Sequence, residues 1–517
     1  MATPSEKLAE SLEILKELQN KEGAAAIRAS DLSRTHRERL VQNGFLEEVM
    51  KGWYIPTRPG EQPGTSTAWY ASFWSFCSVY LKQRFGQEWS LSPEQSLLLH
   101  SGNWTVPAQL LVRSPNARNK SNSLPHNTSL FDIRSNVPQP SDRVEKEGLI
   151  IFSLPASLVA ISPGFFKSNA TDIRTALLMI RDASDILPNL LDGGHTVIAG
   201  RLAGAFRNIG RDKIADDILN AMRSAGYDSR ENGPFETRLL SVTGREASPY
   251  VNRLKVMWHE MRDPIIARFP ESPGIPTDID VFLEHVREVY VNDAYHSLSI
   301  EGYRVTPELI DRVRSGAWDP HDDGKDKAHR DALAARGYWQ AYQAVVNSIR
   351  KILKGGNAGT VADEDHGTWY RELFSPSIAV GLLKPSDLAG YRNGPVYIMN
   401  SMHVPLNRDA VRDAMPAFFD LLRQEPHPAV RVVLGHFLFV YIHPYMDGNG
   451  RTGRFLMNAM LASGGYPWTI IPVEDRRTYM QALEQASVNQ NIIAFTDFLA
   501  GLVRKGIEGK PLPKIPT

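Results

Sequence analysis

Hydrophobic residues recur at helical spacing along most of the C-terminal half of this sequence. From about residue 278 to residue 508 the pattern is mainly helical, and one extended stretch interrupts it around residues 396–405. The apolar run Ala429–Ile442 predicts a buried helix, and residues 455–462 predict another helix that ends at a Gly-Gly pair. We therefore expect an all-α bundle over residues 276–508, with a loop between these two helices.

The N-terminal part of the chain has a different pattern. Residues 5–20 place leucines at helical spacing, and two short helical pieces are predicted within residues 29–42. Residues 45–55 then alternate well enough to predict a small hairpin with a Lys-Gly turn. Three helices followed by a hairpin predict a winged helix-turn-helix over residues 1–60.

The middle of the chain mixes helix and strand patterns. We expect a small α/β accessory domain over residues 61–230 and a linker over residues 231–275, where Asn-Gly-Pro and several prolines punctuate the sequence. The predicted fold class is therefore multidomain and mainly α. It comprises an N-terminal winged helix, the α/β domain and a C-terminal helical bundle with a β-hairpin.

Composition narrows the functional classes. The formal net charge is +0 over 517 residues, so no overall field favours a nucleic-acid or membrane partner. The single cysteine, Cys77, excludes an intrachain disulfide framework and favours a reducing compartment. The N-terminus lacks the apolar core of a signal peptide, and no apolar run reaches membrane-spanning length. A cytoplasmic protein without a membrane partner is expected.

The richest chemistry lies in His443–Arg454, a segment that we call the signature loop. Its Gly-Asn-Gly run can turn backbone amides toward one point, and a helix N-terminus adds partial positive charge there. Arg451 and Arg454 are i,i+3 neighbours on one helical face, aimed at the same region. The arrangement suits a polyphosphate. Histidine and aspartate also gather within residues 321–329, where we expect a solvated loop that enters a helix.

The loop closely resembles the Fic signature, His-Pro-Phe-x-(Asp/Glu)-Gly-Asn-Gly-Arg-x-x-Arg, with Tyr445 in place of the usual Phe. The resemblance implies transfer of AMP from ATP to a hydroxyl of a target protein. It implies that His443 takes the hydroxyl proton and that Asp447 binds Mg²⁺, although Asp447 could also be a helix N-cap. The nucleotide-binding residues that it implies are Gly448, Asn449, Gly450, Arg451, Arg454 and Tyr479. For Tyr479 a core position is the alternative.

A second motif, Ser297-Leu-Ser-Ile-Glu301-Gly302, is similar to the Fic inhibitory motif (Ser/Thr)-x-x-x-Glu-(Gly/Asn). The resemblance implies an ion pair between Glu301 and Arg454 that occupies the space of the ATP γ-phosphate. The alternative is a surface glutamate before a glycine that ends a helix. Because the motif precedes the signature loop in one chain, we expect intramolecular inhibition.

Residues 396–405, called the flap segment below, resemble the Fic flap, a hairpin beside the active site. Such an edge can pair with an extended target segment and set its hydroxyl in register. The alternative is an ordinary hairpin packed on the bundle. The residues assigned to target docking are Val396, Tyr397, Ile398, Met399 and His403.

Residues 88–97 read Glu-Trp-Ser-Leu-Ser-Pro-Glu-Gln-Ser-Leu, and residues 129–134 read Ser-Leu-Phe-Asp-Ile-Arg. Together with the predicted wing, these motifs resemble the AbiEi-type antitoxin or regulator family over about the first 160 residues. DNA recognition would use basic side chains on the second helix of the turn, namely Arg34, His36, Arg37 and Arg39. The first 56 residues nevertheless carry nine acidic and eight basic side chains, so docking of a protein is the competing interpretation.

The leading hypothesis is a protein adenylyltransferase that uses ATP and Mg²⁺ and is inhibited by Glu301. Its partner would be a protein with a Tyr, Ser or Thr hydroxyl, the chain itself included. One alternative is removal of AMP, with Glu301 positioning a water. Another is a nucleotide-sensing transcriptional regulator or antitoxin-like protein, although an intact His443 argues against a purely binding role. A homo-oligomer that buries the inhibitory helix or the flap would be a natural control point.

Overall fold

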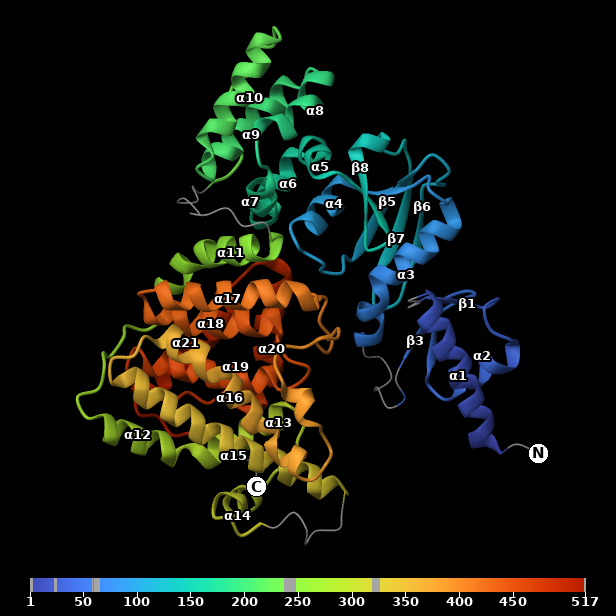
Figure 1. Ribbon diagram of the computed structural model, residues 1–517. Helices are drawn as coiled ribbons and strands as arrows, with labels where there is room; N and C mark the ends of the chain where they lie inside the picture. The colour runs from blue at the N-terminus through green and yellow to red at the C-terminus, as the bar shows by residue number, and fades with distance from the viewer. Residues whose placement is uncertain are drawn as a thin grey trace. The chain divides into compact units, whose positions relative to one another are not determined.

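The computed structural model describes residues 3–22, 26–57, 59, 66–236, 248–318 and 326–515, so residues 321–325 of the predicted solvated loop lie outside the described residues. The chain forms two compact units (Figure 1). Unit 1 comprises Met1–Pro249 together with Tyr397–Val404, and unit 2 comprises Tyr250–Val396 and Pro405–Thr517. Among the described residues, no helix is both long enough and apolar enough to cross a membrane.

Unit 2 is a helical bundle around one hydrophobic core. Its α-helices are α11 (Pro249–Ile266), α12 (Ile279–Glu288), α13 (Tyr290–Ile300), α14 (Pro307–Arg314), α15 (Asp326–Leu353), α16 (Ala358–Ala379), α17 (Arg408–Gln424), α18 (Pro428–Ile442), α19 (Asn449–Ala462), α20 (Arg476–Asn489) and α21 (Ile493–Ile507). The short 3₁₀ helices η3 (Pro385–Leu388) and η4 (Val473–Asp475) complete the unit. The predicted bundle is confirmed.

The two central helices carry the signature loop between them. Almost all of α18 is apolar and buried, and it packs along α19 in the middle of the unit (Figure 1). The structure starts α19 at Asn449, earlier than the apolar pattern predicted, because the polar residues of the signature loop form its first turn. The glycines and arginines of the motif therefore lie at a buried helix N-terminus.

The predicted linker over residues 231–275 is wrong in its second half, which contains α11. Leu254, Met257, Trp258 and Met261 of this helix are buried in the core of unit 2. The Trp258 indole also donates a hydrogen bond of 3.1 Å to Glu425. The apolar spacing is helical, so the segment buries a face instead of bridging two domains. The boundary between the units lies at residues 249–250.

Unit 1 begins with two helices and a three-stranded antiparallel sheet of order β1-β3-β2. These elements are α1 (Pro4–Glu22), β1 (Ile27–Arg28), α2 (Arg34–Gln42), β2 (Leu46–Met50) and β3 (Trp53–Pro56). The predicted hairpin is present, with Gly52 at positive φ in its turn. Residues 29–32 form a turn instead of the predicted short helix, because the Asp31 carboxylate bonds back to the backbone and side chain of Arg28.

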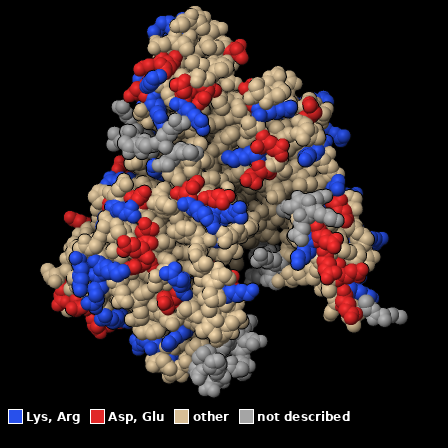
Figure 2. Space-filling view, in the orientation of Figure 1, with Lys and Arg blue, Asp and Glu red and all other residues tan. Residues whose placement is uncertain are grey.

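The basic side chains of α2 serve contacts inside this module. The His36 ring and the Arg39 guanidinium both hydrogen-bond to Ser11 of α1, at 2.9 and 2.8 Å. Arg37 donates to the Ala29 carbonyl, and Arg34 pairs with Glu38. Beside them α1 presents a band of acidic side chains (Figure 2), which comprises Glu6, Glu10, Glu13 and Glu17. These contacts and this charge oppose the DNA interpretation.

The predicted α/β region of unit 1 contains a four-stranded sheet of order β4-β5-β7-β6, in which β5 and β7 are parallel. Its elements are α3 (Thr67–Phe85), β4 (Ser90–Leu91), α4 (Pro93–His100), β5 (Gln109–Ser114), β6 (Lys120–Ser123), β7 (Ser129–Arg134), η1 (Pro140–Asp142) and the pair β8 (Arg143–Lys146) and β9 (Leu149–Phe152). A helical part follows with α5 (Leu154–Ala160), α6 (Pro163–Ser168), α7 (Ala170–Met179), η2 (Ala183–Asp185), α8 (Leu187–Asp192), α9 (Thr196–Asn208) and α10 (Asp212–Ser224). The resemblance to AbiEi-type proteins stays a prediction.

The flap segment does not form the predicted β-hairpin. Its residues are irregular, with Asn400 in the left-handed region at φ 59°. The backbone bonds to unit 1 instead of to a second strand: the Val106 amide donates to the Met402 carbonyl at 3.0 Å, and the Asn400 amide donates to Thr67 Oγ1 at 3.3 Å. Contacts between distant parts of the sequence thus take the groups that a hairpin would pair.

Candidate active site

A strained turn presents the signature loop. His443 ends α18 in the left-handed conformation, at φ 56°, which is uncommon for a residue other than glycine. Arg392 holds this turn: its amide donates to the Pro444 carbonyl at 2.9 Å and its Nε donates to the His443 carbonyl at 2.7 Å. Arg392 is buried. The sequence analysis assigned it no role, although it directly precedes the flap segment in a Gly-Tyr-Arg-Asn-Gly run.

The His443 ring is arranged as a neutral base. Its Nδ1 lies 3.1 Å from the Val440 carbonyl, which accepts a proton only from a protonated Nδ1. The other ring nitrogen, Nε2, is therefore left as the acceptor. Burial lowers the pKa of His443 to about 4, and the positive charge of Arg392 acts in the same direction. The imidazole is uncharged at neutral pH.

The side chain of Asn449 shapes the loop. Its Oδ1 accepts from the Tyr445 amide at 2.9 Å, and its Nδ2 donates to the Tyr445 carbonyl at 2.8 Å. Both polar ends of this amide therefore bond to the backbone of the loop, and the contact predicted between Asn449 and a phosphate stays a prediction. Tyr445 in turn stacks on Tyr370, with ring centroids 3.7 Å apart. The Asn449 backbone amide, at the start of α19, remains part of the predicted anion site.

A carboxylate lies in that anion site. Oε1 of Glu301 is 2.7 Å from Nη2 of Arg454, so the ion pair implied by the inhibitory motif is present. A Cβ placed on Gly450 would lie 2.3 Å from the same oxygen, which puts the carboxylate directly against the N-terminal turn of α19. Burial pushes the pKa of Glu301 upward, but the charges of Arg454 and Arg451 outweigh it and the pKa is lowered. Glu301 is ionised at neutral pH.

Ser297 fixes the same arginine from one turn earlier in α13. Its hydroxyl accepts from Nε of Arg454 at 2.9 Å, and its carbonyl accepts from Nη2 at 3.0 Å. Three of the motif's features thus converge on Arg454: the serine hydroxyl, the serine carbonyl and the glutamate carboxylate. The remaining nitrogen, Nη1, is buried and has no hydrogen-bond partner of ordinary geometry among the residues that the structure describes. It marks a donor that an anionic ligand could use.

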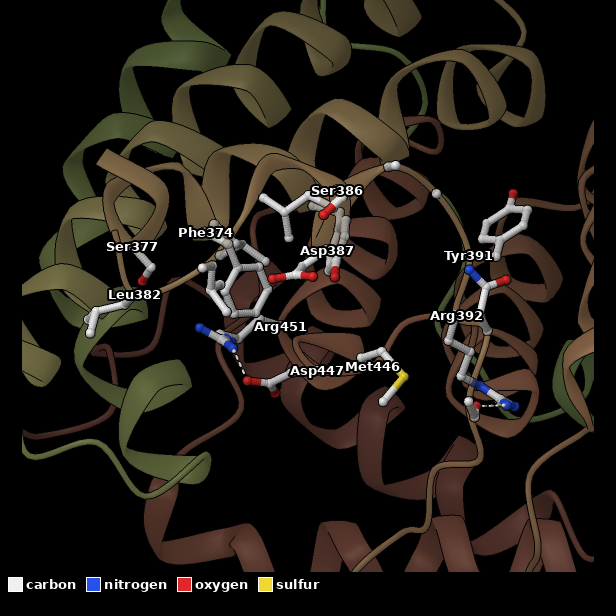
Figure 3. Close-up of a pocket in the computed structure, with 18 of the residues that line it drawn as sticks. Phe374, Ser377, Leu382, Ser386, Asp387, Tyr391, Arg392, Met446, Asp447 and Arg451 are labelled. Carbon is white, nitrogen blue, oxygen red and sulfur yellow. Dashed lines mark hydrogen bonds and ion pairs between the residues drawn. The ribbon is translucent and has the colours of Figure 1, made fainter. Parts of the chain in front are cut away.

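Asp447 lies at the rim of a cavity of about 960 Å³ beside the loop (Figure 3). Its side chain is 68% exposed, and its Oδ1 accepts from the Gly448 amide at 2.6 Å. Mg²⁺ bound with a nucleotide needs one or two carboxylates and takes its other ligands from phosphates and water. Among the described residues, no group of three or more His, Cys, Asp or Glu side chains gathers into a metal cage. The exposed carboxylate of Asp447, next to the anion site, fits a Mg²⁺ site whose other ligands come from a bound nucleotide and water.

Tyr479 and the flap segment complete the set of predicted site residues. Tyr479 is fully buried, and its hydroxyl is hydrogen-bonded to Nε2 of His436 on α18 at 2.7 Å, so the structure places it in the core under the loop. Its contact with a nucleotide stays a prediction. In the flap segment, Tyr397 and Met399 are 39% and 66% exposed, whereas His403 is buried.

Comparison with known proteins agrees with this geometry. Residues 368–461 match the Fic/DOC family, and this span includes Arg392, the flap segment and the signature loop. The chain carries a Fic domain. Ser297 and Glu301, which belong to the predicted inhibitory motif, lie outside the matched span.

Several curated relatives of the Fic domain share the name protein adenylyltransferase Fic. The protein from Nematostella vectensis is 29% identical over 279 residues, which is 53% of this chain and 60% of the relative. The protein from Drosophila willistoni is 35% identical over 230 residues, which is 43% of this chain and 42% of the relative. The chain therefore spans about half the length of the curated relatives it matches.

Solved structures with a Fic domain also match. Fic-1 (residues 134–508) from C. elegans has 19% identity and a TM-score of 0.37, with 63% of this chain and 91% of that chain covered. A Fic domain containing signaling protein from Bacteroides thetaiotaomicron has 17% identity and a TM-score of 0.34, with 52% and 100% covered.

Proposed function

We propose that this chain is a protein adenylyltransferase that transfers AMP from ATP to a protein hydroxyl and is inhibited by its own Glu301. One observation carries the proposal: the Glu301 carboxylate is bound by Arg454 against the N-terminus of α19. The carboxylate of Glu301 thus lies where we expect a phosphate of the nucleotide to bind, in the same loop as the neutral His443. The names of the relatives support the same reaction.

The chain's residues divide the reaction as follows. Nε2 of His443 accepts the proton of the acceptor hydroxyl as its oxygen forms a bond to the α-phosphorus. The bond from that phosphorus to the bridging β-oxygen breaks, and pyrophosphate leaves. The first-turn amides of α19 and the two arginines bind the phosphates and balance their negative charge. Mg²⁺, held by Asp447 and phosphate oxygens, would supply further neutralisation of the leaving group.

Glu301 inhibits by competing for the phosphate position. While its carboxylate bonds to Arg454, the end of the triphosphate meets a negative charge instead of a free guanidinium. The nucleotide then binds out of line for attack on the α-phosphorus, and misplacement by about 1 Å costs roughly a hundredfold in rate. Inhibition therefore acts through the same arginine that catalysis needs.

The decisive experiment measures label transfer from α-³²P-ATP with Mg²⁺ to the chain itself. We expect Glu301→Gly to raise labelling at least severalfold, and Glu301→Gly/His443→Ala to lower it again by about 10²–10⁴, the usual contribution of a general base. Equal labelling in wild type and Glu301→Gly would remove Glu301 from the inhibitory role. ATP binding without labelling in any variant would favour a nucleotide sensor.

The ionised state of Glu301 supports a second candidate, removal of AMP from a modified protein. Its side chain is 29% exposed, so a water can reach a charged carboxylate near His443. In that reaction Glu301 would orient the water that attacks the phosphorus. Protein labelled by the Glu301→Gly variant is the substrate for the test: loss of label on adding the wild type, but not Glu301→Gly, would show removal.

A further inference from the structure

The other arginine of the signature loop, Arg451, is buried without a strong hydrogen-bonded counter-ion. Its Nη2 lies 3.5 Å from Asp447, which is largely exposed, and within the described part of the chain its Nε has no hydrogen-bond partner. The charge of Glu301 attracts that of Arg451, but such an attraction does not fix the orientation of a guanidinium as a hydrogen-bonded pair would. Something else must hold this guanidinium in place.

Two aromatic rings supply that support. The Arg451 Cζ lies 5.2 Å from the ring centroid of Tyr303 and 5.0 Å from that of Phe374. Both distances are within the range of a cation–π interaction. Figure 3 shows the Phe374 ring directly beside the Arg451 guanidinium, which extends toward Asp447. All three side chains line the cavity next to the signature loop.

The inhibitory motif fixes the position of Tyr303. After α13 ends, the Gly302 amide donates to the Ser299 carbonyl and the Tyr303 amide donates to the Leu298 carbonyl. With Gly302 at φ 84°, these bonds form a Schellman motif. The Glu-Gly pair thus directs Glu301 toward Arg454 and sets Tyr303 at a fixed place two residues later.

Phe374 is fixed by a separate element. It projects from α16 and packs against the loop so closely that a Cβ on Gly448 would lie 2.9 Å from its ring. Gly448 is at φ 76°, so glycine is required there for both its conformation and its lack of a side chain. The ring therefore supports the turn before α19 and the arginine that follows it.

We propose that Tyr303 and Phe374 are positioning residues that clamp Arg451 for the β- and γ-phosphates of ATP. Resting on the proposed function, this assigns a second role to the inhibitory segment. Glu301 withholds Arg454 from the nucleotide, whereas Tyr303 prepares Arg451 for it. Both rings contact the guanidinium without accepting a conventional hydrogen bond from it, so its N–H groups, including the unpartnered Nε, are left for an anion.

The test measures nucleotide affinity by calorimetry in the Glu301→Gly background, with ATP, ADP and AMP in the presence of Mg²⁺. We expect Tyr303→Ala to weaken binding of ATP and ADP by about tenfold, since a cation–π contact of this kind is lost. Binding of AMP, which lacks the outer phosphates, should be unchanged. Tyr303→Phe keeps the ring and should bind ATP as the background does.

A loss of affinity that is equal for AMP and ATP would overturn the clamp, as would an unchanged ATP affinity in Tyr303→Ala. Phe374→Leu removes the other aromatic ring. It should also weaken the binding of ATP and ADP while leaving the binding of AMP unchanged. Thermal unfolding of each variant identifies any that fail to fold, and the partly exposed Tyr303 keeps the test independent of Phe374. If the affinities change as expected but no variant transfers label, the result would contradict the proposed adenylyltransferase activity. The proposed positioning of Arg451 by Tyr303 and Phe374 would still be supported.

Discussion

The conformation of one histidine links the fold to the chemistry. His443 stands at the end of a buried helix in a left-handed conformation that Arg392 stabilises through backbone carbonyls. The same turn brings its Nδ1 to the Val440 carbonyl and leaves Nε2 as the proton acceptor. A base that is neutral by burial needs no further partner to activate it.

The pKa of about 4 predicts the pH dependence of transfer. Because the pKa is lowered, His443 loses its proton more easily than an ordinary histidine, and the base form is present throughout pH 6–8. We expect the single-turnover rate of labelling by Glu301→Gly to be level across this range and to fall only below about pH 5. ATP affinity measured at each pH is the control. A tenfold fall per pH unit beginning near 6.5 would show an ordinary histidine.

At the scale of elements, the end of α13 sets both arginines of the signature loop. One Schellman turn aims Glu301 at Arg454 and Tyr303 at Arg451. The geometry of the site therefore depends on the backbone of Gly302 as well as on the side chains around it. A change that strains the turn moves both neighbours at once.

Gly302→Ala tests this dependence. Alanine at φ 84° is strained although no atom lies within 4 Å of the new Cβ, and we expect a loss of about 1 kcal/mol in the free energy of unfolding. Labelling should rise above that of the wild type because Glu301 is displaced. Gly316→Ala is the matched control: Gly316 has φ 77° and the same pair of bonds at the end of α14. Gly316→Ala should lose a similar amount of stability while its labelling stays at the wild-type level. If labelling rises in both variants, backbone strain alone explains the effect.

Some of these elements could be predicted from the sequence, and others could not. The helices around the signature loop followed from their apolar spacing, and the inhibitory motif followed from a resemblance that is local in sequence. Arg392, Tyr303 and Phe374 were missed because their roles arise from contacts with residues far along the chain. The linker prediction failed at α11, where punctuation by prolines concealed an apolar helical face.

At the scale of the whole molecule, one segment within the span that matches the Fic/DOC family packs with unit 1. Residues Tyr397–Val404 group with unit 1, and Val404 packs against the core that includes α3. The predicted hairpin is absent because the hydrogen bonds of this segment go to Thr67 and Val106. Sequence pattern alone gives the extended character of a segment, but its partner is decided by tertiary contacts.

The hold of unit 1 on the flap segment can be measured by hydrogen exchange. Oδ1 of Asn400 accepts from the Ser66 amide at 3.3 Å, and the exposed Met399 beside it provides a matched control. Loss of one hydrogen bond is worth about 1 kcal/mol, so Asn400→Ala should speed exchange of peptides covering residues 397–404 by roughly fivefold. Met399→Ala should leave it unchanged. If Asn400→Ala also exchanges at the wild-type rate, the side chain of Asn400 does not hold the segment. A target that pairs with the flap edge would then have to displace the Val106 and Thr67 contacts themselves.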